Sequence, residues 1–564
     1  MHKFKGGIIL CLFIFIINPA YPKLPEEYKL LIKYRKTKNL TKKIEIGKRI
    51  VKEYPNAVFI DDLKIMLAKN LLKKGRKGEA RRLISEVRVG RIRYDLIEDF
   101  AELSKKLGVV KKTAVVELPE YFREYIGRIK FNEEEVYKIA RRLYAKRMYK
   151  EAKVIIDKYY PQYRRLCYIE AKIFYRSGEY NRALDILEGC DHPKRDELAV
   201  RIFLRNRKYD KALSYIEHKV KNKEEIYLFA GRYIFRDGLP MLSKVFLERA
   251  KDSFEKFFFL GLVNYAEHNY EEALKYFKQA MRKSSNGRKL SKASFWVYKS
   301  LVALGSNKEN PSGYLVLSSI GDGFYSATSK VYLGKRVADI STLKVGYEGK
   351  KSAILSILRE IKSAGFLHYM RLEALRRASN FTKRDVLLLS KEDPYLALKI
   401  AIRKWGAGSD IYKAISYAYP YKDIVLKLSR KYSVDPSLIY AIMRQESLFD
   451  PYAISRAGAK GLMQLMDRTA RWVSRKYGIR MRNIFNIKTN IEIGIAYLAY
   501  LKKLWNNDMV RVIASYNAGE NAVRRWRNYD DIYLFIESIP YAETRRYVKK
   551  VLYNFYIYSE RDLN

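Results

Sequence analysis

The stretch GEYNRALDIL, residues 178–187, is one copy of a pattern that recurs along the chain. Each copy has a turn, a tyrosine, an alanine three residues later and aliphatic residues at helical spacing. The alanines Ala152, Ala183 and Ala212 lie about thirty residues apart, Ala273 lies two such steps further on, and Ser243 takes the position between. The other copies are RMYKEAKVII (147–156), RKYDKALSYI (207–216), HNYEEALKYF (268–277) and, more weakly, KGRKGEARRLI (74–84).

This period indicates stacked helix hairpins of the tetratricopeptide type, although the repeat is slightly short. A small residue lets two helices approach closely, and the tyrosine can pack on the neighbouring pair. Because one hairpin cannot bury its own apolar face, the pairs must stack into a superhelix. We therefore expect the repeat tyrosines and alanines to belong to the core and not to a ligand site.

The chain has 564 residues, which is too many for one ordinary core. Its pattern is helical from about residue 25 to 415, and glycine-rich and proline-rich breaks interrupt it at 305–314, 321–323, 404–410 and 417–423. The sequence predicts an all-α protein. We expect a signal peptide at 1–20, a helical-repeat superhelix at 21–345, a helical linker domain at 346–417 and a C-terminal domain at 418–564.

The N-terminus has the layout of a cleavable secretory signal. A short basic region, MHKFKGG (1–7), precedes the apolar run IILCLFIFII (8–17), and Ala20 offers a small residue for cleavage. The apolar run is too short to span a membrane comfortably, and Cys11 lies inside it without the small residue before it that a lipoprotein signal needs. We expect a periplasmic protein with no stable membrane insertion after cleavage.

The charge of the chain points to an anionic partner. Lys and Arg total 112 against 62 Asp and Glu, a net charge of +50. Nucleic acid, acidic lipid and a carboxylate-rich polymer would all fit such a charge. Because an exported chain rarely meets nucleic acid, we assign the charge to an acidic polymer of the cell envelope. The alternative, that many of these residues only solvate outer helix faces, stays open.

Two cysteines would remain after cleavage, Cys167 and Cys190. They flank an expected helix hairpin that turns near Gly178. Two buried free thiols are the simpler interpretation. A disulfide between them is the alternative in an oxidising compartment.

An acidic residue interrupts an apolar stripe in AIMRQESLFDP (441–451). Asp435 and Pro436 begin a predicted helix, and Glu446 continues the stripe of Leu438 and Ile442. Burial and the negative end of the helix dipole both raise the pKa of a carboxyl group, so Glu446 could stay protonated near neutral pH. A protonated carboxylic acid is suited to general-acid cleavage of a glycosidic bond. The alternative is a structural glutamate paired with an arginine, Arg444 or Arg456.

Three further segments contain polar residues in helical patterns. In SRAGAKGLMQLM (455–466), the glycines allow close approach of the backbone to a ligand or a neighbouring helix. Ser455 and Gln464 are suited to hydrogen bonds with amides and hydroxyls, and Met463 is suited to contact with a sugar ring or an N-acetyl methyl group. In ASYNAGENAV (514–523), Tyr516 and Asn517 lie at a helix end that Gly519 would stop, and a capped helix with a half-buried tyrosine is the simpler interpretation. The third segment is ESIPYAETRRYV (537–548), in which Glu543 is expected to be ionised and paired with arginine but could also bind substrate.

Together these segments resemble the catalytic domain of the soluble lytic transglycosylases, which has a goose-lysozyme-like fold. The resemblance covers about residues 419–560. The long helical region before it is similar in architecture to the large periplasmic members, in which a U-shaped superhelix and a linker domain form a ring. The matching pieces occur in the family's order: RQESLFDP (444–451), SRAGAKGLMQLM (455–466), NIEIGIAYL (490–498), ASYNAG (514–519) and IPYAETRRYV (539–548).

The resemblance implies roles for the site residues. Glu446 takes the place of the single catalytic acid/base, and Ser447 follows it in the family's Glu-Ser pair. Asp467 is a departure, because the family often has proline there, and we expect it to begin a helical turn away from the chemistry. The substrate-binding positions that the resemblance implies are Ser455, Met463, Gln464, Tyr516, Asn517 and Glu543.

The implied reaction cleaves the bond between N-acetylmuramic acid and N-acetylglucosamine in peptidoglycan and forms a 1,6-anhydro ring. Hydrolytic glycosidases normally need two carboxyl groups, and no second buried acid is evident, since Asp450 lies in a loop and Glu520 follows a helix end. Neither metal nor cofactor is expected. Peptidoglycan strands are the expected partner, with other cell-wall enzymes as further candidates. A glycan-binding protein without turnover and a lysozyme-type hydrolase are the alternative functions.

Overall fold

The computed structural model describes residues 24–160, 162–305, 309–338 and 353–561. The predicted signal peptide, residues 1–20, lies outside them. Within the described ranges the regular structure is helical, and β-structure there is limited to two isolated bridges, Ile454 with Lys460 and Lys460 with Leu465. The predicted all-α class is confirmed. Among the described residues no helix combines the length and the apolar character that crossing a membrane would require.

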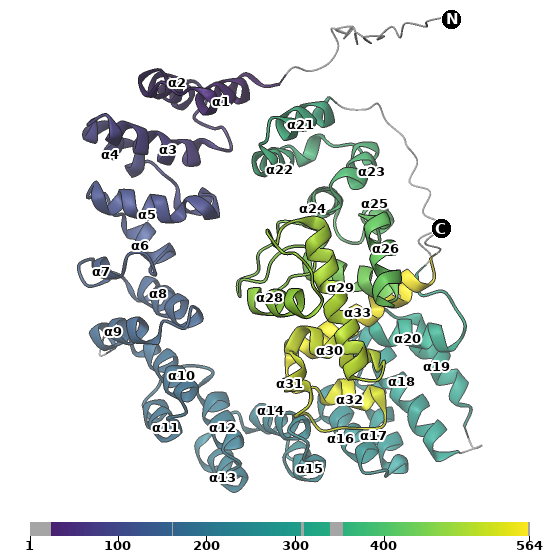
Figure 1. Cartoon of the computed structure of the whole chain (residues 1–564). Helices are drawn as coiled ribbons and strands as arrows, with labels where there is room; N and C mark the ends of the chain where they lie inside the picture. Colours follow the sequence, from purple (N-terminus) through teal and green to yellow (C-terminus); the bar gives the residue numbers. More distant parts are fainter. Residues whose placement is uncertain (1–23, 161, 306–308, 339–352, 562–564) are drawn as a thin grey trace, which may run out of the picture. The chain divides into compact units, whose positions relative to one another are not determined.

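The chain forms two compact units, one from residues 1–109 and 345–412 and the other from residues 110–344 and 413–564. Helix α25 (Asp410–Ile415) lies at the junction. The helices of the first unit, drawn in purple and green in Figure 1, are α1 (Glu26–Lys36), α2 (Leu40–Glu53), α3 (Ile60–Lys73), α4 (Lys77–Ser85), α5 (Ile97–Lys106), α21 (Ile354–Ser363), α22 (Leu367–Arg376), α23 (Lys383–Glu392) and α24 (Pro394–Trp405).

The second unit has a repeat part and a C-terminal part. The repeat part contains α6 (Lys112–Glu117), α7 (Arg123–Ile126), α8 (Glu133–Ala145), α9 (Tyr149–Tyr159), α10 (Cys167–Ser177), α11 (Tyr180–Glu188), α12 (Arg195–Arg205), α13 (Tyr209–Lys219), α14 (Lys223–Arg236), α15 (Pro240–Glu248), α16 (Phe254–Ala266), α17 (Tyr270–Arg282), α18 (Gly287–Leu304), α19 (Pro311–Ile320) and α20 (Phe324–Tyr332). The C-terminal part contains α26 (Lys422–Tyr432), α27 (Pro436–Ser447), α28 (Asp467–Lys476), α29 (Ile487–Leu504), α30 (Met509–Ala518), α31 (Glu520–Val523), α32 (Ile532–Ser538) and α33 (Ala542–Ser559).

The first unit joins segments that are far apart in sequence. The rings of Tyr28 and Phe59 lie 5.3 Å apart between centroids, and Phe59 lies 5.6 Å from Tyr369. The Tyr369 hydroxyl donates to Asp62 Oδ2 at 3.0 Å. The N-terminal helices therefore share a core with α21–α24. The boundary expected between residues 345 and 346 lies outside the described residues, and the division into superhelix and linker domain stays a prediction.

The repeat predicts the hairpins of the second unit. The repeat alanines Ala152, Ala183, Ala212 and Ala273 are completely buried, as expected. Ser243, which replaces alanine, is also buried and donates to Gly231 O at 2.8 Å, so its hydroxyl is satisfied within the helix pair. Successive helices of the repeat part contact each other, for example α10 with α11, α14 with α15 and α16 with α17 (Figure 1).

The repeat tyrosines occupy a different place from the one expected. Helices α9, α11 and α17 begin at Tyr149, Tyr180 and Tyr270, and these side chains are only half-buried. Each packs on a tyrosine of the preceding helix; Tyr270 and Tyr265, for example, have ring centroids 5.1 Å apart. The phenol rings therefore cover the edges of the hairpins, which suits an amphipathic side chain.

The two cysteines are bonded. Cys167 begins α10 and Cys190 follows α11, with the turn between the helices at Gly178, and the Cα atoms of the cysteines lie 5.6 Å apart in a disulfide. The free-thiol interpretation is therefore wrong. The bond closes one hairpin of the repeat around the buried Ala171 and Ala183. The hairpin geometry brings the two positions together, which their sequence spacing alone did not establish.

A buried charge cluster attaches the C-terminal part to the repeat part of the same unit. Glu537 of α32 is 1% exposed, and it accepts from Tyr325 Oη at 2.5 Å and Lys549 Nζ at 2.7 Å and pairs with Lys292 Nζ at 3.0 Å. Burial alone would raise the pKa of this carboxyl group, but the two ammonium groups outweigh it and hold the pKa well below its usual range. Tyr325 and Lys292 come from α20 and α18, so four helices meet at one carboxylate.

Replacing this carboxylate tests how much it contributes to stability. We expect Glu537→Gln to lower the free energy of unfolding of the second unit by about 3–5 kcal/mol, because two buried ammonium groups lose their counter-charge. Denaturant unfolding at neutral pH measures the change. The matched control is Glu272→Gln, which removes an exposed pair with Lys275 and should leave the midpoint unchanged. Equal midpoints for the two variants would contradict the assignment.

Candidate active site

Helix α27 presents Glu446 as the sequence predicts. Asp435 caps it by accepting from Ser437 N at 2.7 Å, and Pro436 is its first residue. Leu438, Ile439 and Ile442 are buried in the core. The helix ends at Ser447, where Leu448 and Phe449 adopt left-handed backbone angles. Glu446 therefore lies in the last turn, at the negative end of the helix dipole.

The Glu446 carboxyl group has one strong partner. The Tyr547 hydroxyl donates to Glu446 Oε1 at 2.6 Å. Burial raises the pKa of Glu446 from 4.5 to about 7, the Tyr547 hydrogen bond opposes this, and the charge of Glu543 adds to it. A carboxyl group with this pKa is partly protonated at neutral pH and can both give and take a proton.

The ion-pair alternative for Glu446 does not fit the structure. Arg444 Nε donates to Ser416 O at 2.7 Å, and its Nη1 donates to Asn554 Oδ1 at 3.2 Å. Its guanidinium group lies 4.4 Å from the Tyr417 ring centroid. Among the ion pairs of the described ranges, none includes Glu446, which is consistent with its raised pKa.

The sequence reasoning missed Tyr547. It lies on α33, is buried, and faces α27 four residues after Glu543. That spacing places Glu543 and Tyr547 on the same side of the helix, so the segment that drew attention to Glu543 also contained the signal for Tyr547. Burial and the charge of Glu446 raise the pKa of Tyr547 well above its usual range, so the phenol keeps its proton.

The loop of residues 453–466 is held by its own polar side chains. Ser455 Oγ accepts from Ala459 N at 3.0 Å. Gln464 Nε2 donates to Ala453 O at 3.1 Å and to Gly461 O at 2.8 Å. Two predicted binding residues therefore shape the loop, and their contact with substrate stays a prediction.

Helix α29 holds this loop through hydrogen bonds from Asn490. Asn490 Oδ1 accepts from Met463 N at 2.9 Å, and its Nδ2 donates to Lys460 O at 3.1 Å and Ile484 O at 2.9 Å. Gly461 has φ +75°, and a Cβ there would lie 2.4 Å from Asn490 Nδ2, so the position requires glycine. Met463 is completely buried, and its side chain lies where any Cβ at Gly494 would be. The side chain of Met463 thus supports the loop and does not line its surface, unlike our expectation.

Helix α30 contributes Tyr516 and Asn517 to the site. It ends at Ala518 with Gly519 as the stop, close to the predicted end. The Tyr516 hydroxyl donates to Met463 O at 2.9 Å. Burial, and to a smaller extent the charge of Glu446, raises the pKa of Tyr516 well above its usual range. Asn517 Oδ1 accepts from Thr544 Oγ1 at 2.7 Å. Tyr516 therefore lies beside both the loop and Glu446, while Asn517 joins α30 to α33.

The remaining predicted residues have distinct environments. Ser447 is buried and its hydroxyl donates to Met443 O at 3.2 Å, within its own helix. Glu543 is exposed in the first turn of α33. In the described ranges no ion pair includes Glu543, unlike the pairing we expected. Asp467 begins α28 as predicted and pairs with Lys460 Nζ at 2.8 Å.

The sequence of this region matches a known domain family. Residues 423–538 match the family described as the Transglycosylase SLT domain. The matched range includes Glu446, Tyr516 and Asn517. Over 140 residues it is 38% identical to the soluble lytic murein transglycosylase of Salmonella typhimurium and 37% identical to that of Escherichia coli K12. Each match covers 23% of this chain and 22% of the relative.

The chain is also similar to a membrane-bound relative. Over 161 residues the chain is 40% identical to membrane-bound lytic murein transglycosylase C of Edwardsiella ictaluri, which covers 24% of this chain and 45% of the relative. The chain thus spans less than half the length of these curated relatives.

Solved structures extend the likeness in fold. The 70 kDa soluble lytic transglycosylase of Escherichia coli matches with a TM-score of 0.63 and 17% identity. The lytic transglycosylase Slt of Pseudomonas aeruginosa, an inactive mutant, matches with a TM-score of 0.55 and 19% identity. Both matches cover 95% of this chain and 92% of the other. At this identity they show the fold alone.

The raised pKa of Glu446 has a consequence for stability. Between pH 4.5 and 7 an unfolded chain releases this proton while the folded protein retains it, so Glu446 stabilises the fold fully below about pH 4.5, and this contribution is lost as pH rises to about 7. Glu446→Gln should therefore be about as stable as the wild type at pH 4 and more stable at pH 8, by up to about 3 kcal/mol.

Thermal unfolding at the two pH values measures this difference. The exposed Asp530 provides the control, because Asp530→Asn should not change the pH dependence of Tm. A Glu446→Gln variant that is no more stable than wild type at pH 8 would show that the carboxyl group is not desolvated.

Proposed function

We propose that this chain is a peptidoglycan lytic transglycosylase that uses Glu446 as its single acid/base. It cleaves the β-1,4 bond between N-acetylmuramic acid and N-acetylglucosamine and leaves a 1,6-anhydromuramoyl end. The observation that carries the proposal is a desolvated carboxyl group with a pKa of about 7 inside an SLT domain. The names of the relatives, lytic murein transglycosylases, support the same reaction.

The proposed reaction has two proton transfers. Protonated Glu446 gives its proton to the bridging oxygen as the bond from muramoyl C1 to that oxygen breaks, and the substrate's own N-acetyl group stabilises the positive charge at C1. Glu446, now ionised, takes the proton of the muramoyl 6-hydroxyl while O6 bonds to C1. Glu446 ends protonated, and no water is consumed.

Tyr547 is suited to this double role. Its hydroxyl donates to Glu446 Oε1 and stabilises the ionised form that exists between the two transfers. Its own raised pKa keeps it from becoming a competing anion. Tyr516, Gln464 and Asn490 fix the loop beside it, and preorganised groups of this kind lower the cost of reaching the transition state.

A lysozyme-type hydrolase is the second candidate, and Glu543 favours it. Its charge is felt by Glu446, so it is a carboxylate near the acid. Hydrolysis would need it to activate water or to bond to the sugar. Its exposure leaves its ionised form well solvated and makes it a weaker second group than a buried acid. A glycan-binding protein without turnover is the remaining alternative.

The expected setting of the reaction is the periplasm. The predicted signal peptide and the net charge of +50 support an exported protein that approaches carboxylate-rich peptidoglycan strands. Other cell-wall enzymes are further candidate partners. No cofactor takes part in the proposed steps.

Product analysis on purified sacculi tests the reaction. Wild-type protein should release muropeptides with anhydro ends, whose mass is one water lower than that of hydrolysed ends. Glu446→Gln should lower the release rate by at least about a thousandfold, because no group remains to protonate the bridging oxygen. Glu492→Gln, a change in α29 away from the site, should keep full activity. Reducing ends in the wild-type products would establish hydrolysis.

Two variants should move the pH profile in opposite directions. The alkaline limb of kcat/KM should lie near pH 7 in wild type, because Glu446 must be protonated. Tyr547→Phe removes a hydrogen bond that lowers this pKa, so the limb should move to higher pH. Glu543→Gln removes a charge that raises it, so the limb should move to lower pH.

Steady-state rates on isolated glycan strands between pH 5 and 9 measure these shifts. Glu492→Gln again serves as the control. An alkaline limb that stays in place in both variants would mean that a group other than Glu446 controls the rate.

A further inference from the structure

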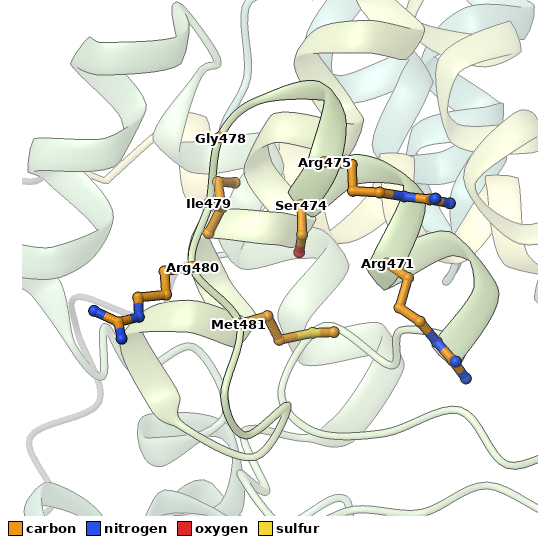
Figure 2. Close-up of a pocket in the computed structure, with 7 residues that line it drawn as sticks. All are labelled: Arg471, Ser474, Arg475, Gly478, Ile479, Arg480 and Met481. Atoms are coloured by element: carbon orange, nitrogen blue, oxygen red, sulfur yellow. The ribbon is translucent and has the colours of Figure 1, made fainter.

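A pocket on the C-terminal part is lined by residues other than those of the candidate active site. It has a volume of about 650 Å³ and is formed by the end of α28 and the segment that follows it (Figure 2). None of its residues belongs to the proposed reaction. Its lining is Arg471, Ser474, Arg475, Gly478, Ile479, Arg480 and Met481.

Three arginines give this pocket a positive charge with no carboxylate in its lining. Arg471 and Arg475 are four residues apart on α28 and share one face, and Arg480 lies on the other wall. All three are exposed, and in the described ranges no ion pair includes them. Arg471 Nε donates weakly to Asp467 O at 3.4 Å. The guanidinium groups are therefore available to an anion.

The Ser474 hydroxyl is a second, independent indication that the pocket binds a ligand. The residue is 8% exposed, and its hydroxyl oxygen is buried with no hydrogen-bond partner within the described structure. In Figure 2 the hydroxyl points between the walls, toward Met481. A buried hydroxyl without a partner is unfavourable, so an acceptor atom supplied by a ligand would satisfy it.

The walls are fixed in place. Ile479 N donates to Ser474 O at 2.8 Å, and Gly478 between them has φ +65°, which lets the chain turn directly after α28. Ile479 and Met481 add an apolar surface beside the arginines. The pocket thus has a hydroxyl donor and an apolar wall, with the arginines at its rim. In Figure 2 the guanidinium groups of Arg471 and Arg475 extend to one side and that of Arg480 to the other.

We propose that this pocket binds the terminal carboxylate of a peptidoglycan stem peptide. The carboxylate accepts from Ser474 and from an arginine at the rim, and the methyl group of a terminal alanine packs on Ile479 and Met481. A carboxylate with a small apolar group fits this lining better than a bare phosphate, which would leave the apolar wall unused. This inference rests on the proposed function, because it assigns a second contact with the same polymer.

Such a contact would hold the strand by its peptide while the glycan enters the active site. Binding two parts of one chain raises the effective concentration of the second part at its site. Arginine is suited to this contact because its fork of donors can hold both oxygens of a carboxylate.

Calorimetry on the full chain carrying Glu446→Gln tests the site without turnover. The probe is a free stem tetrapeptide that ends in D-alanine, compared with the same peptide amidated at its C-terminus. We expect binding of the free acid, at least tenfold weaker binding of the amide, and at least tenfold weaker binding of the acid after Arg475→Ala or Arg480→Ala. Ser474→Ala should weaken binding several-fold.

Arg468→Ala is the matched control, because it removes an exposed arginine of α28 that does not line the pocket. Equal binding of acid and amide, no effect of the arginine variants, absence of binding, or tighter binding of inorganic phosphate would each overturn the proposal. The result is separate from catalysis: peptide binding with no anhydro products from the wild-type chain would overturn the proposed function alone.

Discussion

The hydrogen bond between Tyr547 and Glu446 is the contact on which the site depends. It joins the last turn of α27 to α33 and, among the described residues, is the one hydrogen bond of a carboxyl group that burial would otherwise keep neutral. Burial and the phenol act in opposite directions on the pKa, and their balance leaves it near 7. A group in that balance can exchange a proton in both directions.

Helix α33 connects this site to the rest of the second unit. Tyr547 and Lys549 are two residues apart and so lie on roughly opposite sides of the helix. One side contacts Glu446, and the other pairs with Glu537 and so with α18 and α20 of the repeat part. Both polar contacts are partly buried, so a shift of α33 would disturb both. The repeat part therefore helps to place the phenol that controls Glu446.

Short-range patterns were predictable because their causes are local. The cap at Asp435, the stop at Gly519 and the start of α28 at Asp467 follow from backbone chemistry within a few residues. Burial of the repeat alanines follows from a period that repeats along the chain. The half-buried position of Tyr270 was not predictable in this way, because it depends on how far the neighbouring hairpin reaches.

The sequence by itself determined the helical class and the hairpin repeat, since both rest on spacing and residue type. It also singled out Glu446 as the proposed acid, through the resemblance of its segments to a known family. Only the tertiary structure decided that Cys167 bonds to Cys190, that Met463 lies beneath its loop, and that Tyr547 is the partner of Glu446. These contacts join residues that are 23 to 101 positions apart. Local propensity carries no information about such distances, because only the packing of whole helices brings these side chains together.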